Sequence, residues 1–312
     1  MRDALVRVRV PATSANLGPG FDTLGLALSV YDELTVSALD SNEIDIVVEG
    51  TGAAEIPTDE SNLIIRTIRY AYESVGRIAP GIRIRARNGI PHGRGLGSSG
   101  SAVVAGLLAA KGLLEGTATL SDADLLRLAT EIEGHPDNVA PALFGGLTIA
   151  WTDDEMPRHK KLLVHRGVAP VVFVPERTMS TTTARSVLDP AVSREDAVFN
   201  VSRSALLIAA LTQSPDLLMA ATEDRLHQPS RAAAMPETDS LVRALRAAGF
   251  AAVVSGAGPS VLVLADGPGR RLDAAAVAEK HTGGSWQPLM LAVDFLGGTV
   301  KASAEGALSH EL

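Results

Sequence analysis

A glycine- and serine-rich segment at residues 91–101, PHGRGLGSSGS, runs directly into an apolar stretch at residues 102–114. This pattern predicts a loop of small residues that opens a buried helix. Small side chains leave the backbone N–H groups of such a loop accessible, and the N-terminus of the following helix carries a partial positive charge. The segment is therefore a candidate phosphate cradle, although a glycine-rich turn that only begins a helix accounts for the same residues equally well.

Two common nucleotide loops do not fit this segment. Residues 95–100, GLGSSG, satisfy the dinucleotide pattern G-x-G-x-x-G, but that pattern also requires a strand and an acidic residue after the helix. Here the helix is followed by EGTATLSDADLL, which resembles the start of another helix, and the Gly-Lys-Ser/Thr sequence of a Walker loop is absent. The remaining functional interpretation is a different nucleotide loop, with Ser98 or Ser99 near the phosphates or a magnesium ion.

The composition excludes several classes of function. A length of 312 residues suits two domains, and a net charge of −8 argues against binding to nucleic acid or anionic membranes, which requires basic surfaces. The chain has no cysteine, which excludes disulfides, thiolate metal sites and a cysteine nucleophile. The longest apolar run, residues 102–114, is too short to cross a bilayer and contains Lys111. We expect a soluble, cytoplasmic protein without a nucleic-acid or membrane partner.

Residue periodicity predicts a mixture of strands and helices in the first half of the chain. Strands are expected where apolar and polar residues alternate, at residues 4–10, 24–38, 43–49, 81–87 and 145–151. Helices are expected at residues 62–75, from the end of the Gly/Ser-rich loop through residues 102–114, and at 122–132. Ser121 is a suitable N-cap for the last of these helices, and residues 133–141 are expected to form a polar loop.

The second half continues the mixture without a strict alternation of strand and helix. Strands are expected at residues 171–174, 251–255, 260–265 and 287–295. Helices are expected at residues 195–213, 216–226, 238–248 and 272–281. This order favours an α+β fold over a doubly wound sheet. A charged, proline-containing stretch at residues 153–161 predicts a domain junction, which gives domains at residues 1–155 and 156–312.

Three further segments carry candidate site residues. In residues 11–22, PATSANLGPGFD, Asn16 and Asp22 could hold a ligand ammonium or hydroxyl group, but they are also ordinary turn residues. In residues 133–138, EGHPDN, the spacing does not suit zinc, whereas Glu133 alone suits Mg²⁺, which also takes phosphate oxygens and water. In the second half, Arg185 and Arg231 could clamp a carboxylate, although most arginines are surface charges.

Together these segments resemble the homoserine kinase family of the GHMP kinase superfamily. Three motifs carry the resemblance in the expected order: PATSANLGPGFD at 11–22, PHGRGLGSSGS at 91–101 and VSGAGPSVLVL at 254–264. The first motif and EGHPDNVAPALFGG at 133–146 are typical of that family, and the resemblance extends over residues 6–295. It implies a two-domain GHMP kinase fold, with a ribosomal protein S5 domain 2-like N-terminal domain and a ferredoxin-like C-terminal domain, and commonly a homodimer.

The resemblance also implies roles for individual residues. The ATP phosphates would be wrapped by Pro91, His92, Gly93, Arg94, Gly95, Leu96, Gly97, Ser98, Ser99, Gly100 and Ser101. One serine of the pair Ser98/Ser99, here taken as Ser99, would hold Mg²⁺ together with Glu133. The homoserine site would be lined by Asn16, Asp22, His135, Asn138, Arg185 and Arg231. Asp22 would bind the ammonium group and the two arginines the carboxylate, while residues 256–260 would close over the site.

The implied reaction is the phosphorylation of L-homoserine by ATP to O-phospho-L-homoserine, in threonine biosynthesis. Asn138, Thr181 and Arg185 are the predicted catalytic residues, with Thr181 near the reacting hydroxyl. Asn138 is expected where mevalonate kinase relatives place an aspartate base, and Asp137 has no clear role as a base, so we expect direct attack by the hydroxyl on the γ-phosphate. Two alternatives remain open: another small-molecule kinase of the superfamily, of the mevalonate type, and a non-catalytic nucleotide-binding sensor.

Overall fold

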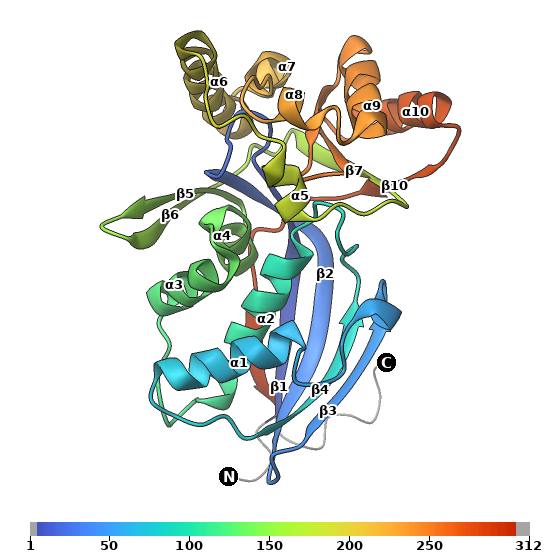
Figure 1. Cartoon of the computed structure of the whole chain (residues 1–312). Helices are drawn as coiled ribbons and strands as arrows, with labels where there is room; N and C mark the ends of the chain where they lie inside the picture. The colour runs from blue at the N-terminus through green and yellow to red at the C-terminus, as the bar shows by residue number, and fades with distance from the viewer. Residues whose placement is uncertain (1–4, 304–312) are drawn as a thin grey trace.

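The computed structural model of the chain describes residues 5–303, which form two parts, each built on its own β-sheet (Figure 1). The strands of the first sheet are β1 (Leu5–Ala15), β2 (Leu24–Leu39), β3 (Ile44–Gly50), β4 (Gly81–Asn88), β5 (Leu147–Asp153), β6 (Met156–Leu162) and β11 (Thr299–Ser303). Five of them follow the order β11-β1-β2-β4-β3, and β5 and β6 extend the sheet from β2. β3 and β4 pair in parallel, whereas β1 and β2 pair antiparallel.

Four helices cover one face of this sheet (Figure 1). They are α1 (Leu63–Ser74), α2 (Ser98–Leu113), α3 (Asp122–Glu133) and α4 (Pro136–Phe144). α2 is apolar on all sides because it lies in the centre of the layer, against β1 and the other three helices. This central position holds the N-terminus of α2, and the glycine-rich loop before it, in a fixed place.

Two predicted helix starts of this layer are confirmed in detail. Asn62 caps α1 by accepting hydrogen bonds from the amides of Ile64 and Ile65, at 2.9 and 3.4 Å. Ser121 caps α3, and with Asp124 it forms a reciprocal capping box. α3 runs from this cap to Glu133, so the helix determines where the Glu133 carboxylate lies.

The second sheet has the order β10-β7-β9-β8, with every neighbouring pair antiparallel. Its strands are β7 (Val168–Pro175), β8 (Ala251–Val254), β9 (Val261–Asp266) and β10 (Trp286–Met290). Helix α9 (Pro236–Ala247) precedes β8, and α10 (Arg270–Thr282) follows β9. This β-α-β-β-α-β order is the ferredoxin-like arrangement, which confirms the predicted α+β fold of the second part.

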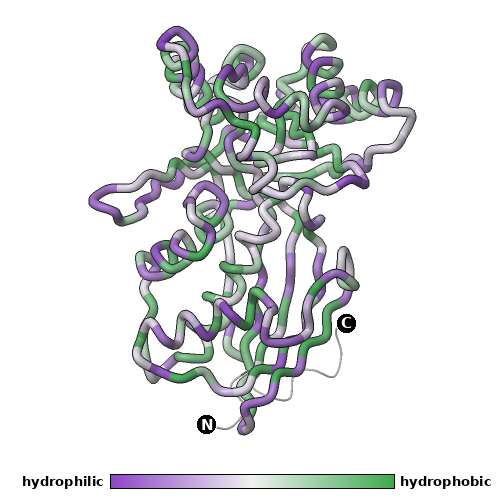
Figure 2. Tube along the Cα trace, in the orientation of Figure 1, coloured by the Kyte–Doolittle hydropathy of each residue, from purple (hydrophilic) through white to green (hydrophobic). Residues whose placement is uncertain are grey.

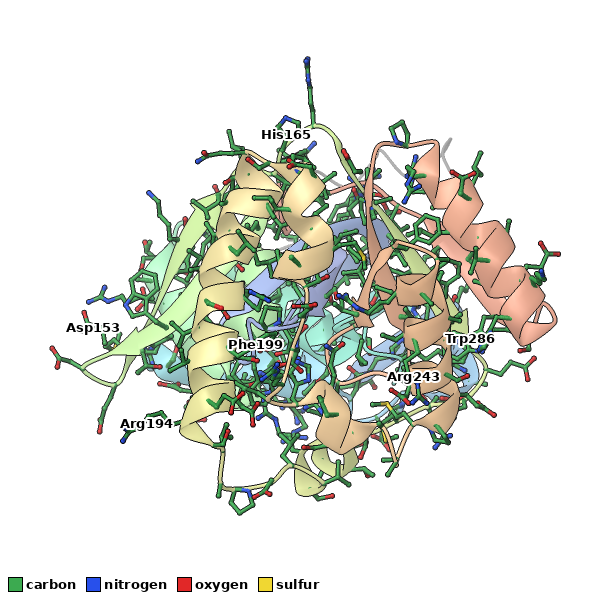
Figure 3. The ribbon with its side chains drawn as sticks, turned by 90° about the horizontal axis from the view of Figure 1, so that it is seen from above. Asp153, His165, Arg194, Phe199, Arg243 and Trp286 are labelled. Carbon is green, nitrogen blue, oxygen red and sulfur yellow. The ribbon has the colours of Figure 1, made fainter. Side chains whose placement is uncertain are left out.

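A long helical insertion separates β7 from α9. It contains α5 (Thr181–Ser186), α6 (Arg194–Thr212), α7 (Leu218–Ala221) and α8 (Gln228–Arg231), together with a 3-10 turn at Pro215–Leu217; another such turn, Ala53–Glu55, lies between β3 and α1. Seen from above, α6 with Arg194 and Phe199 lies on one side of the molecule, and α9 with Arg243 lies on the other (Figure 3). The insertion brings α5 and α8 to the junction of the two sheets.

Several predicted elements are wrong in extent or type. Residues 133–141 contain the start of α4 rather than a loop, because Pro136 at the first helical position suits a helix start and Val139 and Leu143 are buried. Residues 216–226 hold only the end of the 3-10 turn and the short α7, not one helix. The last predicted strand ends at Met290, and a further strand, β11, pairs with β1.

The stretch at residues 153–161 is a hairpin rather than a linker. β6 pairs with β5 along its whole length, and the hairpin projects from the first sheet with hydrophilic residues at its tip (Figure 2). Strands from both sides of residue 155 therefore contribute to the first sheet, and a domain division at that residue stays a prediction. Within residues 5–303, no helix is both long and apolar enough to cross a membrane.

Candidate active site

The glycine-rich loop connects β4 to α2 and passes close to both parts of the molecule. Gly97, the N-cap of α2, has a φ of +70°, and a Cβ atom there would overlap Thr13 Oγ1 on β1. Gly95 has a φ of +72°, and a Cβ there would overlap the carbonyl oxygen of Ser255. Only glycine meets both the backbone and the space requirement at these positions.

Hydrogen bonds fix the loop between the two parts. The amide of Thr13 donates to the carbonyl of Leu96 at 3.0 Å. The Ser255 hydroxyl donates to the carbonyl of Gly95 at 2.7 Å, and it lies 2.9 Å from the hydroxyl of Ser14 on β1. The carbonyl groups of the loop thus point into the protein, which leaves its N–H side for an anion.

Arg94, within the loop, forms hydrogen bonds to the end of β7. Its guanidinium donates to the backbone carbonyls of His92 at 2.9 Å, Pro175 at 2.9 Å and Glu176 at 2.6 Å. The last two carbonyls lie at the end of β7, so Arg94 ties the loop to the second sheet. Arg94 thus adds a positive charge to the loop, while its hydrogen bonds are made to backbone carbonyls of the protein.

The predicted phosphate-loop residues differ in their access to solvent. Pro91, Leu96, Gly100 and Ser101 are buried. The Ser101 hydroxyl donates to the carbonyl of Pro11 at 2.9 Å, and its amide donates to the carbonyl of Gly97. Ser101 therefore fastens α2 to β1 and has no donor left for a ligand.

Ser99 and Glu133 are adjacent although 34 residues separate them in the chain. The Ser99 hydroxyl in the first turn of α2 donates to Glu133 Oε1 at 2.5 Å, at the end of α3. Among the described residues there is no cluster of three or more His, Cys, Asp or Glu side chains that could hold a metal alone. One hydroxyl and one carboxylate suit Mg²⁺, which completes its octahedral shell with water and phosphate oxygens.

An apolar pocket of about 220 Å³ adjoins the loop, and the sequence did not indicate it. Its lining comes from β2, β3, β4, the region that opens α1, and α2, together with the loop residues His92, Ser98 and Ser99. Its apolar residues include Ile46, Val48, Ile64, Ile84, Ala86 and Ala102. In sequence these residues are indistinguishable from core positions, since no polar motif marks them.

The loop between β1 and β2 is anchored by Asn16. Asn16 has a φ of +70° and is almost fully buried, and its amide nitrogen donates to the carbonyl of Gly256 at 2.9 Å. Its amide oxygen accepts from the backbone amide of Asp22 at 3.0 Å. Asn16 therefore joins this loop to the turn after β8 and sets the position of Asp22.

Asp22 forms a two-pronged ion pair with Arg185 of α5. Arg185 Nη1 lies 3.0 Å from Asp22 Oδ2, and Nη2 lies 2.6 Å from Oδ1. The hydrogen bonds to Asp22 raise the pKa of Arg185. Thr181, at the start of α5, is exposed, and its hydroxyl makes no hydrogen bond to other side chains or backbone within residues 5–303.

Arg231 of α8 is the largest fully buried side chain of the described residues. Its Nε donates to the carbonyl of Ala184 at 3.0 Å, and its Nη1 donates to His227 Nδ1 at 3.0 Å and to the carbonyl of Gly256 at 3.3 Å. Burial lowers the pKa of Arg231, and the nearby Arg185 lowers it further. The two predicted carboxylate-binding arginines are thus close together.

The EGHPDN segment faces the same region. His135 Nδ1 lies 2.6 Å from Asp137 Oδ1, and this hydrogen bond raises the pKa of His135. The Asp137 carboxylate is itself buried, with 2% of the residue exposed. The Thr13 hydroxyl donates to Asn138 Oδ1 at 2.9 Å, beside Gly97. Asn138 therefore lies where the glycine-rich loop meets α4.

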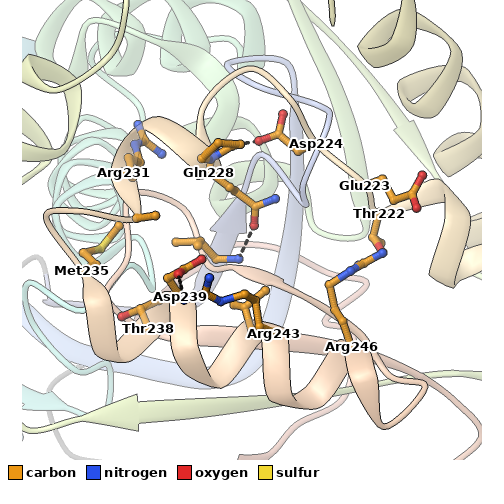
Figure 4. A pocket seen from close by; sticks show the side chains of 14 residues that line it. Thr222, Glu223, Asp224, Gln228, Arg231, Met235, Thr238, Asp239, Arg243 and Arg246 are labelled. Carbon is orange, nitrogen blue, oxygen red and sulfur yellow. Dashed lines mark hydrogen bonds and ion pairs between the residues drawn. The ribbon is translucent and has the colours of Figure 1, made fainter.

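A second cavity, of about 420 Å³, lies behind α8 (Figure 4). Its walls come from α8, α9 and the segment after α7, and they include Arg231 and Met235. Gln228 Oε1 accepts a hydrogen bond from the amide of Val254 at 2.7 Å across this cavity wall. No sequence motif predicted this cavity.

Comparison with known proteins identifies the class and then the family. The family model for the GHMP kinases N terminal domain matches residues 62–146, and that for GHMP kinases C terminal matches residues 206–282. The fold and the glycine-rich loop are accordingly those of a GHMP kinase.

Relatives along the whole chain specify the family. The chain is 64% identical to homoserine kinase of Leifsonia xyli subsp. xyli, over 98% of this chain and 95% of that protein. It is 62% identical to homoserine kinase of Clavibacter michiganensis subsp. michiganensis, over 98% and 99%. The crystal structure of homoserine kinase from Cytophaga hutchinsonii matches with a TM-score of 0.85 at 28% identity, covering 96% of this chain and 98% of that chain. The chain belongs to the homoserine kinase family.

Proposed function

We propose that this enzyme transfers the γ-phosphoryl group of ATP to the side-chain hydroxyl of L-homoserine, forming O-phospho-L-homoserine for threonine biosynthesis. The supporting observation is the position of Asn138, which accepts a hydrogen bond from Thr13 beside Gly97, the N-cap of α2, and follows the His135–Asp137 pair at the start of α4. An anion-binding loop and a cluster of charges of both signs meet there, as a reaction between ATP and an amino acid requires.

The ATP half of the site combines the loop with the apolar pocket. The pocket of about 220 Å³ opens beside Ser98 and Ser99 and is apolar enough to receive the adenine ring. The free N–H groups of the loop and the N-terminus of α2 would then bind the phosphates. Gly93, Gly95 and Gly97 allow that backbone to approach the phosphates closely.

Ser99 and Glu133 would hold Mg²⁺, since they present a hydroxyl and a carboxylate at the mouth of the loop. The ion would supply positive charge for the β- and γ-phosphate oxygens. We assign Ser99 rather than Ser98 to this role because Ser99 is the serine in contact with Glu133.

The homoserine half uses charges of both signs. Asp22 would bind the substrate ammonium group, and Arg185 and Arg231 would bind its carboxylate. Asn16 orients Asp22 through its amide, so it acts by positioning. His135 and Asn138 would line the side toward the γ-phosphate, and Thr181, whose hydroxyl is free for a ligand, would approach the reacting hydroxyl.

We infer direct attack without a side-chain base. The homoserine oxygen forms a bond to the γ-phosphorus as the bond to the ADP oxygen breaks, and the hydroxyl proton passes late to a phosphoryl oxygen. Asp137 is buried and hydrogen-bonded to His135, which supports a structural role for this carboxylate. Phosphoryl transfer through a loose transition state depends mainly on positioning and charge neutralisation.

We also propose that the enzyme is a cytoplasmic homodimer with no nucleic-acid or membrane partner. The net charge of −8 supports the exclusion of polyanionic partners. The resemblance to the homoserine kinase family supports the dimer. Light scattering coupled to size-exclusion chromatography tests it, and a monomeric mass at micromolar concentration would contradict it.

A coupled ADP-release assay with homoserine, mevalonate, shikimate and galactose tests the reaction. We expect turnover with homoserine and at most traces with the other alcohols. Turnover with mevalonate alone would favour the mevalonate-type alternative. ATP binding without turnover of any acceptor would favour a nucleotide-binding sensor, although the presence of both Ser99 and Glu133 speaks against that function.

A further inference from the structure

A buried histidine, His227, connects the two arms of the proposed homoserine site. Its side chain has no exposed surface. Nε2 lies 2.8 Å from the carbonyl of Gly18, in the loop that carries Asp22, and Nδ1 lies 3.0 Å from Arg231 Nη1. The ring of Phe21 stacks on the imidazole at 4.9 Å between centroids. One side chain thus contacts both the ammonium-binding and the carboxylate-binding parts.

These two contacts fix the tautomer of His227. A carbonyl oxygen can only accept, so Nε2 must carry a proton toward Gly18. A guanidinium can only donate, so Nδ1 must be unprotonated toward Arg231. The imidazole is therefore neutral and protonated at Nε2, which agrees with the lowering of the pKa of His227 by burial. His227 therefore donates through Nε2 to the carbonyl of Gly18 and accepts through Nδ1 from Arg231.

The backbone around His227 is held firmly by Asp224. The Asp224 carboxylate accepts hydrogen bonds from the amides of Leu226, His227 and Gln228, and from the Asn200 side chain at 2.8 Å. His227 precedes α8 directly, so Arg231 lies one helical turn further along the same short element. The start of α8 thus holds His227 Nδ1 within hydrogen-bonding distance of the Arg231 guanidinium.

Hydrogen bonds fix the direction of the Arg231 guanidinium. The residue is almost fully buried, with 1% of its surface exposed, and it belongs to the wall of the cavity of about 420 Å³ behind α8 (Figure 4). The direction of its guanidinium then depends on its three acceptors, the carbonyls of Ala184 and Gly256 and the imidazole of His227. Of these, His227 is the side chain that a substitution can remove.

We propose that His227 is a positioning residue that directs the Arg231 guanidinium toward the substrate carboxylate and couples it to the loop of Asp22. This inference rests on the proposed function, since it needs an acceptor with a carboxylate. Loss of the Nδ1 acceptor would leave Arg231 one hydrogen bond short in a buried place, and its guanidinium would turn away from the carboxylate. Binding of homoserine would weaken, whereas binding of ATP would not change.

Two substitutions separate the two hydrogen bonds. In His227→Asn the amide oxygen can take the place of Nδ1 and accept from Arg231, while the contact to Gly18 is lost. In His227→Gln the amide nitrogen can take the place of Nε2 and donate to Gly18, while the acceptor for Arg231 is lost. We expect KM for homoserine to rise about tenfold or more in His227→Gln and about threefold or less in His227→Asn, with KM for ATP unchanged in both.

A substrate without a carboxylate makes the test specific. 2-Amino-1,4-butanediol keeps the ammonium and the reacting hydroxyl, so the wild type should phosphorylate it with a high KM. His227→Gln should add no further increase in KM for this diol, because Arg231 has no carboxylate to bind. An equal loss with both acceptors, or a rise in KM for ATP, would overturn the positioning role and indicate general structural damage.

Nitrogen NMR of the wild-type enzyme tests the same inference, should one of the two variants fail to fold. In uniformly ¹⁵N-labelled protein, the His227 imidazole, assigned by the loss of its signals in His227→Gln or His227→Asn, should be neutral and protonated at Nε2, and its Nδ1 resonance should shift when homoserine binds. A protonated imidazole or an Nδ1–H tautomer for His227 would overturn the proposal. If wild-type enzyme does not turn over homoserine at all, the proposed function fails instead, and the two failures are thereby distinguished.

Discussion

The Arg185 guanidinium holds both carboxylate oxygens of Asp22, at 3.0 and 2.6 Å. Each partner is proposed to bind the opposite end of an amino acid, yet in this structure they neutralise each other. A zwitterion carries the same two charges, so it can replace the internal pair without leaving either group uncompensated. Neutral alcohols lack this property, so in the proposed binding mode we expect the ion pair to favour amino-acid acceptors.

Replacing Asp22 with asparagine should impair homoserine binding. Asp22→Asn removes the negative partner of the substrate ammonium, so we expect KM for homoserine to rise about 100-fold or more, with KM for ATP changed less than about threefold. Steady-state kinetics with each substrate varied in turn measures both. Asp45→Asn is the matched control, because Asp45 forms a similar two-pronged pair with Arg85 on the outer surface of β3 and β4. Equal effects in both variants would contradict the role of Asp22.

Replacing Glu133 with glutamine should weaken the use of magnesium. We expect kcat to fall about 100-fold or more and the Mg²⁺ concentration for half-maximal activity to rise, because one charged ligand is lost. Titration of activity with Mg²⁺ at saturating substrates measures this. Glu131→Gln, two residues earlier on α3, serves as the control, since Glu131 instead bonds to Tyr70 and Arg127. An unchanged Mg²⁺ requirement in Glu133→Gln would refute the assignment.

Adding a methyl group at Gly97 should damage the phosphate loop. Gly97→Ala combines a left-handed backbone with overlap against Thr13, so it should lower the free energy of unfolding by about 2 kcal/mol or more and raise KM for ATP. Gly116→Ala has a similar φ, +76°, but open space around the new Cβ, and should cost only about 1 kcal/mol. Urea unfolding and ATP titration compare the two variants. The prediction fails if both behave alike.

The His135–Asp137 pair should make stability depend on pH. The folded pKa of His135 is raised by Asp137, so its stabilisation is fully present below the unfolded pKa and is lost as pH rises through the folded pKa. His135→Gln should therefore lower the free energy of unfolding by about 1 kcal/mol near pH 5.5 and by much less near pH 9. Urea unfolding at the two pH values measures the difference. A constant difference, or a larger one at high pH, would contradict this.

Removing the charge of Asp137 should leave the chemical step largely intact. For Asp137→Asn we expect a fall in kcat of about tenfold or less. The side chain is buried against His135, and asparagine has nearly the same shape as aspartate, so its amide oxygen can still accept from His135. Single-turnover kinetics at saturating homoserine and ATP separates chemistry from binding. A loss of several orders of magnitude in the chemical step, with substrate binding intact, would restore Asp137 as a catalytic base.

The sequence predicted those elements that are determined by residues close together in the chain. The capping residue Ser121 gave the start of α3, apolar periodicity gave α1, and the run of small residues gave the loop before α2. The pairing of Ser99 with Glu133 also followed from the family resemblance, but their contact is a product of packing between α2 and α3.

Elements that are stabilised by contacts with residues far away in the sequence could not be predicted from local patterns. α4 begins in a polar segment with two prolines, and its helical form is stabilised by buried contacts of Val139 and Leu143. β11 exists because it pairs with β1, almost 300 residues earlier in the chain. The pocket beside the loop and the link through His227 arise only when several elements converge, so no short window of sequence contains them.

The hydroxyl of Ser255, next to the second sheet, forms a hydrogen bond to the glycine-rich loop. It joins the carbonyl of Gly95 to the second part of the molecule, so the contact between the two parts helps to hold the loop that we propose binds ATP. On that proposal, docking of the two parts and affinity for ATP are linked, and each strengthens the other by the same factor. We therefore expect a substitution at the contact between the sheets to alter the affinity for ATP without touching it, and bound ATP to oppose separation of the two parts.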